Sequence, residues 1–296
     1  MKIIDVTIPC KSRSDSFFFY VLGDIHLGTL NCAESQVRRL VGKISKSPNA
    51  YWIGGGDYCE CIKPSDLRRF EAEGLPDWIL VPDPEKTREN LRDIVAAQRR
   101  QFKLLVTPIK DKCLGLIEGN HEAGLRKHHN LDHHGFICND LGVEDLTSES
   151  LFRIRFSKLS QGKDQTRIVK LFICHGHGGG RTAGAEPNHL FRLAAQWRAD
   201  IILRGHSHTF CINPPLVELS VPDRGKLPDE CTQYYKRAGN WGCWVKSYAV
   251  GPSTYVTRAT YPPRPLSTLE IEIQPHVHSH NAGPELPKIS MKELVV

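Results

Sequence analysis

The sequence predicts an α/β fold in which helices cover a mostly parallel sheet, and three observations lead to this prediction. Short apolar, β-rich segments alternate along the chain with longer segments in which apolar residues recur every three or four positions. This alternation is typical of βα units, which build parallel sheets. The 296 residues are also 40% hydrophobic and carry a net charge of only +6, which excludes an expanded, disordered chain.

Strands and helices are expected to alternate up to about residue 203. Residues 17–22 form a continuous apolar run bounded by Gly23, which is typical of a buried central strand. Residues 34–46 repeat apolar side chains at helical spacing and predict the first helix. The other expected strands are residues 50–53, 114–117, 168–174 and 201–203. The other expected helices are residues 64–73, 83–105 and 190–198.

The composition changes after about residue 209, where Tyr and Trp increase and Gly and Pro interrupt the chain. Short antiparallel strands are expected at residues 244–250, 254–259 and 269–273. They would complete one domain of residues 1–275, formed by a motif-bearing part, 17–209, and completing strands, 210–275. Residues 276–296, rich in Pro and His, are expected to be a loosely attached tail.

Neither a membrane segment nor a disulfide framework is expected. The apolar run at residues 17–22 is far shorter than the ~20 residues of a membrane-spanning helix. No signal-peptide pattern follows Met1, so a cytoplasmic protein is expected. Most of the ten cysteines stand singly in apolar segments, which indicates reduced, buried thiols. Cys59 and Cys61 lack the second pair of a zinc knuckle and are expected to be structural neighbours of a site.

Side chains that bind metals follow the expected strands up to residue 203, each time at the C-terminal end. Loops at these ends converge on one crevice in open α/β sheets, so a single site is expected. Carboxylate, imidazole and amide oxygen together suit borderline divalent metals such as Mn, Fe, Zn, Co or Ni. One such motif alone is more often a turn or a core histidine, but the whole series predicts a metal centre. In chain order its members are Asp24 and His26, Asp57, Asn120 and His121, His175 and His177, and His206 and His208.

These motifs resemble the calcineurin-like metallophosphoesterase superfamily. The resemblance spans residues 17–209, and the strands up to about residue 273 resemble the second sheet of that family. It implies a four-layer α/β/β/α sandwich with two mixed sheets. It also implies hydrolysis of phosphate esters by in-line attack of a hydroxide that bridges two divalent metal ions, with Mn as the expected metal and Fe, Zn, Co or Ni as alternatives. The motifs that carry it are Asp24-Ile25-His26, Gly56-Asp57, Gly119-Asn120-His121-Glu122, His175-Gly176-His177 and Gly205-His206-Ser207-His208.

The resemblance also implies a role for each matching position. His121 would face the substrate and stabilise phosphoryl charge or protonate the leaving oxygen as a catalytic residue. Glu122 would orient the metal ligands without binding a metal ion itself. Asp57 would bridge the two metal ions. One ion would be held by Asp24, His26 and His208, and the other by Asn120, His175 and His206.

The substrate is expected to be an anionic phosphodiester, in DNA, RNA or a nucleotide. Phosphoprotein phosphatases of the superfamily carry an Arg after the acidic pair of the second motif and another before Gly-Asn-His-Glu. Here the second motif continues Asp57-Tyr58-Cys59-Glu60-Cys61, and Glu118 precedes the third motif, which disfavours that branch. The second histidine of His175-Gly176-His177 resembles the phosphodiesterase and nuclease branches, and the layout resembles phosphoesterases of phage or prophage type. A pI of about 8.8 favours an anionic partner.

Two segments near the motifs are candidates for substrate contact. His177 and Arg181, in and after the fourth motif, would line a phosphate groove. The histidine-rich residues 127–134 are either an exposed polar segment or a rim over the metals.

Two alternatives to a phosphodiesterase stay open, namely a phosphomonoesterase or nucleotide-pyrophosphate hydrolase on the same site, and a non-catalytic protein-binding scaffold. No obligate protein partner and no membrane association are expected.

Overall fold

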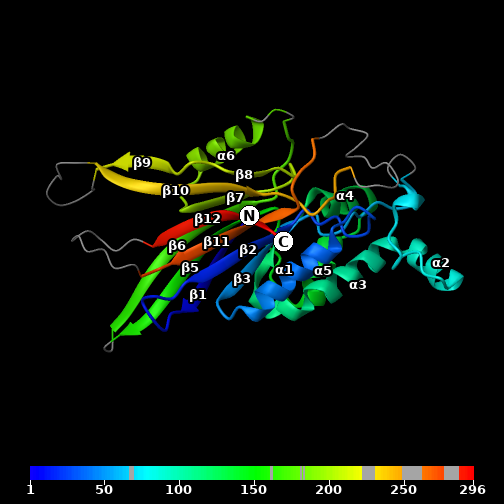
Figure 1. The fold of residues 1–296 in the computed structure, drawn as a ribbon, viewed down its shortest axis with the longest axis horizontal. Coiled ribbons are helices and arrows are strands. Elements are labelled where there is room, and N and C mark those ends of the chain that lie inside the picture. Colours follow the sequence, from blue (N-terminus) through cyan, green and yellow to red (C-terminus); the bar gives the residue numbers. More distant parts are fainter. Residues whose placement is uncertain are drawn as a thin grey trace.

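The computed structural model describes residues 1–296 except 67–69, 161–162, 181, 183, 222–230, 249–261 and 277–286. The strands form two mixed sheets that pack against each other, and helices cover the two outer faces (Figure 1). No helix in the described part of the chain is both long and apolar enough to cross a membrane. All ten cysteines are free thiols, and most are buried, as the sequence predicts.

The first sheet contains the strands that precede the first three motifs. β2, β3 and β4 run parallel, β11 is antiparallel to β2, and β12 is antiparallel to β11. Their order across the sheet is β12 (Lys288–Val295), β11 (Ser267–Gln274), β2 (Phe17–Gly23), β3 (Ala50–Gly56) and β4 (Cys113–Leu116).

The second sheet contains the strands that precede the last two motifs. β6, β7 and β10 run parallel in its centre, while β5 is antiparallel to β6 and β8 is antiparallel to β10. β9 (Leu216–Ser220) pairs with an extension of β10. The order is β1 (Lys2–Pro9), β5 (Glu149–Ser160), β6 (Lys163–Cys174), β7 (Ile201–Arg204), β10 (Thr232–Trp241) and β8 (Phe210–Ile212).

The helices lie in two outer layers. The first sheet is covered by α1 (Glu34–Lys46), α3 (Ile94–Val106) and α5 (His133–Leu141), whose apolar faces pack on its outer side. The second sheet is covered by α6 (Ala185–Gln196). The remaining helical elements are η1 (Ala72–Gly74), α2 (Pro84–Arg92), η2 (Thr107–Lys112) and α4 (Asn120–His129).

Three apolar cores separate the four layers. Phe19 and Ile53 of the first sheet meet Phe156 and Leu203 of the second in the central core. The other two cores lie between each sheet and its helices. The layer order is therefore helix, sheet, sheet, helix, and the predicted α/β/β/α sandwich with two mixed sheets is confirmed.

Several predicted boundaries are wrong. The expected helix 83–105 is two helices, because the Asp93 side chain accepts a hydrogen bond from the Ala96 N–H and begins a new helix there. The expected helix 64–73 is not helical in its described residues, apart from the start of η1. The helix expected at residues 190–198 is the later part of α6, which begins at Ala185 and ends at Gln196.

The C-terminal part differs most from the prediction. In the expected strand 244–250 the described residues form only an isolated bridge at Val245, because the strand of this region, β10, has already ended at Trp241. The expected strand 254–259 lies outside the described residues. The strand expected at 269–273 is found within β11. The expectation of a loose tail is wrong for its last part, because β12 pairs with β11 along its whole length.

Candidate metal centre

The predicted ligands gather at the carboxyl ends of strands from both sheets. Those from the first sheet follow β2, β3 and β4, and are Asp24, His26, Asp57 and Asn120. Those from the second sheet follow β6 and β7, and are His175, His206 and His208. The loops of the two sheets meet at this shared edge, as expected for the carboxyl ends of strands in α/β folds. The site therefore spans the interface between the sheets.

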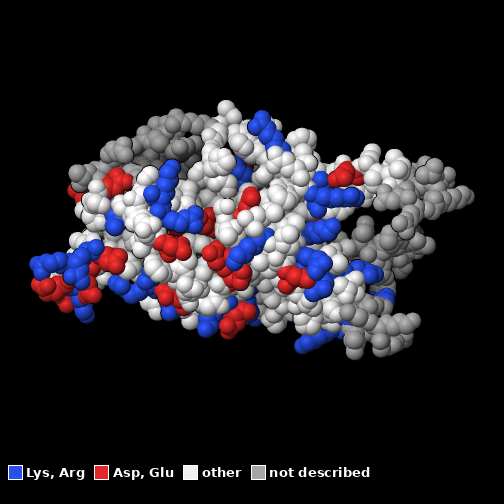
Figure 2. All heavy atoms as spheres, turned by 180° about the vertical axis from the view of Figure 1, so that it is seen from behind, with Lys and Arg blue, Asp and Glu red and all other residues white. Residues whose placement is uncertain are grey.

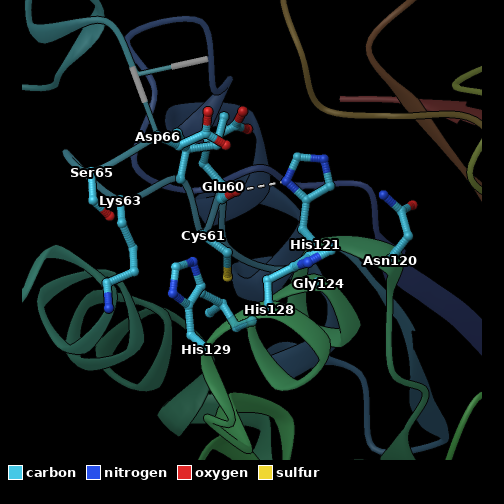
Figure 3. Close-up of a pocket in the computed structure, with 12 residues that line it drawn as sticks. Glu60, Cys61, Lys63, Ser65, Asp66, Asn120, His121, Gly124, His128 and His129 are labelled. Carbon is cyan, nitrogen blue, oxygen red and sulfur yellow. Dashed lines mark hydrogen bonds between the residues drawn. The ribbon is translucent and has the colours of Figure 1, made fainter. Parts of the chain in front are cut away.

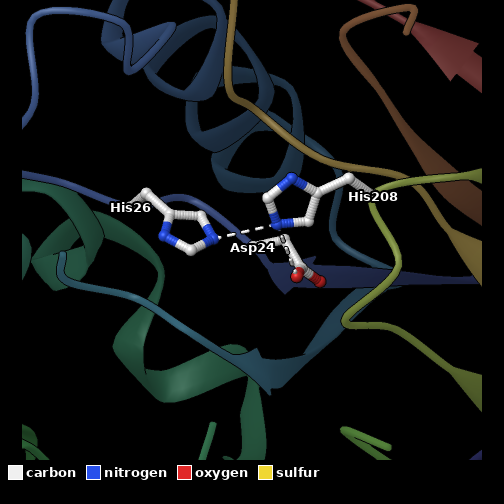
Figure 4. Close-up of side chains that lie close together, drawn as sticks. All are labelled: Asp24, His26 and His208. Carbon is white, nitrogen blue, oxygen red and sulfur yellow. Dashed lines mark hydrogen bonds and ion pairs between the residues drawn. The ribbon is translucent and has the colours of Figure 1, made fainter. Parts of the chain in front are cut away.

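Asp24, His26 and His208 form the first group of side chains (Figure 4). The Nε2 atoms of His26 and His208 lie 3.0 Å apart, and His208 Nε2 lies 3.3 Å from Asp24 Oδ1. Asp24 and His26 are buried, and His208 is partly exposed. Three ligand atoms thus face one small volume.

Asn120, His175 and His206 form the second group. Asn120 Oδ1 lies 3.0 Å from His175 Nε2 and 2.6 Å from His206 Nδ1. Asp57 lies between the two groups, because its Oδ2 atom is 3.2 Å from His175 Nε2 and 3.8 Å from His26 Nε2. Asp57 is thus the side chain that both groups share.

The backbone of these loops adopts a conformation that residues other than glycine rarely take. Such left-handed residues are strained and cluster at functional sites, where the surrounding structure holds them in place. Backbone hydrogen bonds fix the loops here, since the amides of Asp24 and His26 donate to carbonyls of Gly56 and Asp57. The predicted ligands with positive φ are Asp24 at 49°, His26 at 52°, Asp57 at 50°, His206 at 71° and His208 at 55°.

The electrostatics of the cluster favour bound positive charge. Burial opposes ionisation of Asp57, but the neighbouring imidazoles, His175 first, outweigh burial and hold the pKa of Asp57 well below its ordinary value. Burial likewise opposes protonation of His175, but Asp57 and Asp24 outweigh it and raise the pKa of His175 to about 9. Asp57 is therefore ionised at neutral pH and is balanced by the protonated imidazole of His175, whose proton a metal ion would displace.

Hydrogen bonds turn two of the imidazoles toward the cluster. His175 Nδ1 donates to the backbone carbonyl of Gly55 at 2.7 Å, and His26 Nδ1 donates to Glu60 Oε2 at 3.0 Å. Histidines that bind metals commonly donate their other ring N–H in this way, which fixes the tautomer and leaves Nε2 for the metal.

The side chains fit divalent metal ions. Metal–ligand bonds of about 2.1 Å place neighbouring ligand atoms roughly 3 Å apart, which is the spacing between the facing atoms here. One buried oxygen, Asp24 Oδ1, has no hydrogen bond of normal geometry, as expected for an atom reserved for a metal. The mixture of carboxylate, imidazole and amide oxygen suits Mn, Fe, Co, Ni or Zn.

Two functional residues were not anticipated from the sequence. Glu60 contacts two histidines, since its carboxylate accepts from His26 and its backbone carbonyl accepts from His121 Nδ1 at 2.6 Å. Trp241, at the end of β10, donates from Nε1 to Asp24 Oδ2 at 2.7 Å. Glu60 could have been found from its place in the second motif. Trp241 could not, because only the packing of the two sheets brings it to Asp24.

Glu122 lies in the orienting position that the sequence suggests. Its buried carboxylate accepts hydrogen bonds from the backbone amides of Asp57, Tyr58 and Gly119, at 3.0, 2.9 and 3.2 Å. The loops that carry Asp57 and Asn120 are therefore tied to one side chain.

His121 stands beside the cluster. Its ring meets that of His26 edge to face, with centroids 4.6 Å apart, and its amide donates to Asp57 Oδ1. Burial opposes its protonation, but Asp57 and Glu60 outweigh burial and hold the pKa of His121 above its ordinary value. The ring also lines a pocket next to the cluster.

The two predicted substrate-contact segments have different outcomes. The His177 side chain is exposed, and its backbone carbonyl accepts a hydrogen bond from Arg204; Arg181 lies outside the described residues. The histidine-rich segment 127–134 has two parts with different surroundings. His128 and His129 end α4 and line the pocket, whereas His133 and His134 are buried at the start of α5.

Comparisons with known proteins give only weak similarities. No family model matches the sequence, and no curated protein matches it. Similar solved structures include a predicted phosphoesterase from Streptococcus pneumoniae TIGR4, at 12% identity and a TM-score of 0.33, covering 94% of this chain and 99% of that chain. They also include the calcineurin-like phosphoesterase YfkN from Bacillus subtilis, at 13% identity and a TM-score of 0.39, covering 94% and 90%. A third is Vps29 from Entamoeba histolytica complexed with Zn²⁺, at 10% identity and a TM-score of 0.32, covering 94% and 99%.

Proposed function

We propose that this protein is a metal-dependent phosphoric ester hydrolase of the calcineurin-like metallophosphoesterase superfamily, and that it cleaves phosphodiester bonds in nucleic acid or nucleotides. The observation that carries this proposal is the pair of ligand groups that share Asp57 at the edge of both sheets. The motif pattern of the sequence supports the same superfamily.

The grouping of the side chains supports the ligand roles that the resemblance implies. Asp57 would contact both metals. Two divalent cations, with Mn first, would supply Lewis acidity that activates water near neutral pH and neutralises charge on the phosphate. Without cations, ionised Asp57 and protonated His175 would balance each other's charge, and a bound cation would take the place of that proton on His175. Asp24, His26 and His208 would hold one cation, and Asn120, His175 and His206 the other.

His121 would act on the leaving group as the catalytic acid. Glu60 O can only accept, so His121 Nδ1 carries the proton of that hydrogen bond. Asp57 and Glu60 hold the pKa of His121 above its ordinary value, which favours a second proton on Nε2. That N–H is free to donate to a phosphoryl oxygen or to the departing oxygen. Glu60 and Asp57 thus both orient His121 and keep it protonated.

On the face shown in Figure 2, the surface charge does not by itself indicate which substrate the protein binds. Figure 2 shows Lys and Arg interspersed with Asp and Glu over the face it presents. Such an arrangement lacks the single-sign stripe of a dedicated nucleic-acid surface on that face. The residue directly before the third motif is Glu118, whose carboxylate forms an ion pair with Arg126 at 2.6 Å. Specificity for a diester would therefore come from side chains around the metals.

The test compares bis(p-nitrophenyl) phosphate with p-nitrophenyl phosphate in the presence of Mn²⁺. We expect faster turnover of the diester, and losses of about 10²–10⁴-fold in kcat for both Asp57→Asn and His121→Asn. Metal content, measured by elemental analysis, should fall only in Asp57→Asn, because His121 serves the leaving group. A preference for the monoester would support the phosphomonoesterase alternative. Absence of Mn²⁺-dependent turnover in the wild type, with no effect of either substitution, would leave only a non-catalytic scaffold.

A further inference from the structure

A pocket of about 450 Å³ lies beside the metal centre (Figure 3). Asn120 and His121 line its metal-facing side, and the loop after β3 and the end of α4 form the rest. Pockets of about 300–1,000 Å³ hold small ligands, and a single nucleotide falls within that range. The pocket is therefore large enough for a unit of substrate that extends beyond the phosphate being cleaved.

The wall away from the metals offers cationic and hydrogen-bonding groups. Lys63, His128 and His129 line it, and Lys63 and His129 lie on the opposite side of the pocket from Asn120 in Figure 3. Among the described residues, Lys63 forms no ion pair with a carboxylate. An ammonium group in that position is a natural partner for a phosphate.

Two acidic residues also line the pocket, and neither removes this attraction. The Glu60 carboxylate is buried and accepts a hydrogen bond from His26 Nδ1, so it is already engaged by the side chains of the cluster. Asp66 is on the rim and has a partner of its own in the structure. The helix dipole at the end of α4 disfavours anions, but the last turn carries Arg126 and Lys127 as well as its two histidines.

The remaining wall is apolar or small. Ile62, Leu125 and Gly124 line it, and the Cys61 thiol lies between the two polar ends in Figure 3. Such a surface can hold a sugar or a base by van der Waals contact. The pocket thus has a catalytic end, an apolar middle and a cationic end.

We propose that this pocket binds the nucleotide next to the scissile phosphate, with the following phosphate directed to Lys63 and His129. This inference rests on the proposed function and narrows its substrate class to chains of at least two phosphate-bearing nucleotides. DNA and RNA share this chemistry, and the deoxy and ribo forms of one dinucleotide distinguish them. Lys63 is then a specificity-determining residue.

The experiment measures kcat/KM for a dithymidine dinucleotide with and without a phosphate on its 5′ or 3′ end, in Mn²⁺. The wild type should prefer one of the phosphorylated forms. Lys63→Ala should lower kcat/KM for that form about 5–10-fold more than for the unphosphorylated dinucleotide, mostly through KM. The matched control is Lys86→Ala, an exposed lysine on α2 far from the motifs in the chain, which should leave both values unchanged.

Two results would overturn the proposal. One is equal activity on the dinucleotide with and without the extra phosphate, and the other is equal losses for Lys63→Ala on both substrates. Binding of a labelled, non-hydrolysable phosphorothioate dinucleotide provides a readout without turnover, and Lys63→Ala should weaken it about 5–10-fold. Binding that depends on Lys63 without hydrolysis of any ester would refute the proposed function and leave the pocket assignment standing.

Discussion

Glu60 links the metal centre to the residue that would donate the proton. Its side chain fixes His26, a predicted metal ligand, while its backbone fixes His121. Burial opposes ionisation of Glu60, but the imidazoles of His121 and His26 outweigh burial and keep the pKa of its carboxyl below the ordinary value. Glu60 is therefore a charged acceptor that holds His26 in the tautomer that binds metal.

Replacing this carboxylate should weaken metal binding. In Glu60→Gln the neutral amide accepts a weaker hydrogen bond from His26, while the backbone contact to His121 is kept. We expect Mn²⁺ affinity, measured by isothermal titration calorimetry, to fall about 10–100-fold. The control is Glu73→Gln, an exposed carboxylate in the same part of the chain, which should bind like the wild type. Equal affinities for the two variants would show that Glu60 has no part in ligand orientation.

At the scale of elements, α5 carries a histidine that the site does not use. Both ring nitrogens of His133 are buried and have no hydrogen-bond partner among the described residues. Burial, reinforced by the charge of Arg99, lowers the pKa of His133 to about 4. The helix thus keeps a buried, neutral imidazole near Arg99 of α3.

This histidine should make stability depend on pH. The unfolded chain protonates His133 near pH 6.5 and the folded chain only near pH 4, so unfolding takes up a proton between these values and stability falls as the pH drops. The loss amounts to about 2–3 kcal/mol between pH 7 and pH 4. Urea unfolding of His133→Leu should show a flatter pH profile than the wild type in this range, whereas His189→Leu should not. Parallel profiles for all three proteins would contradict this account.

The sequence predicts the strands that carry the ligands better than the strands that surround them. β2, β3 and β7 are buried on both faces, so each is a continuous apolar run that stands out in the chain. β10 begins Thr232-Gln233-Tyr234-Tyr235-Lys236, has polar residues on exposed faces and depends on pairing with β7 and β9. Its place in the sheet follows from tertiary contacts that no local pattern contains.

The site shows the same contrast between residues that local sequence patterns predict and residues that only tertiary contacts bring together. The ligand positions are predictable because each one directly follows an apolar strand. The contribution of Trp241 is not predictable, since it comes from a strand that local patterns miss. The division of the histidine-rich segment into pocket and core residues also required the structure, because α4 ends at the left-handed Asn130 and α5 starts in a new direction.

At the scale of the whole molecule, the metal centre joins the two sheets. Asp24 and Asp57 belong to loops of the first sheet, and His175 and His208 belong to loops of the second. Among the described residues, Trp241 adds a hydrogen bond across the same interface. A cation bound here would therefore cross-link the two halves of the sandwich.

Metal removal should lower the thermal stability of the whole protein. A cation present at 100 times its Kd contributes about 2.7 kcal/mol, which corresponds to roughly 4 °C in Tm for a chain of 296 residues. Differential scanning calorimetry with Mn²⁺ and with a chelator should show this difference in the wild type. Asp57→Asn should lose most of it, and Lys86→Ala should keep it. A Tm that does not respond to metal in the wild type would exclude such a cross-link.

The positions of the predicted ligands along the chain also determine the order in which the site can assemble during synthesis. His26 and His208 face each other across the site although 182 positions separate them in the sequence. During synthesis the first sheet can collect its strands β2, β3 and β4 long before the ribosome reaches His206 and His208. The early chain therefore exposes two carboxylates that have no imidazoles from the second sheet beside them. A cation that takes ligands from both sheets would therefore bind only after the last third of the chain has emerged and the sheets have packed together.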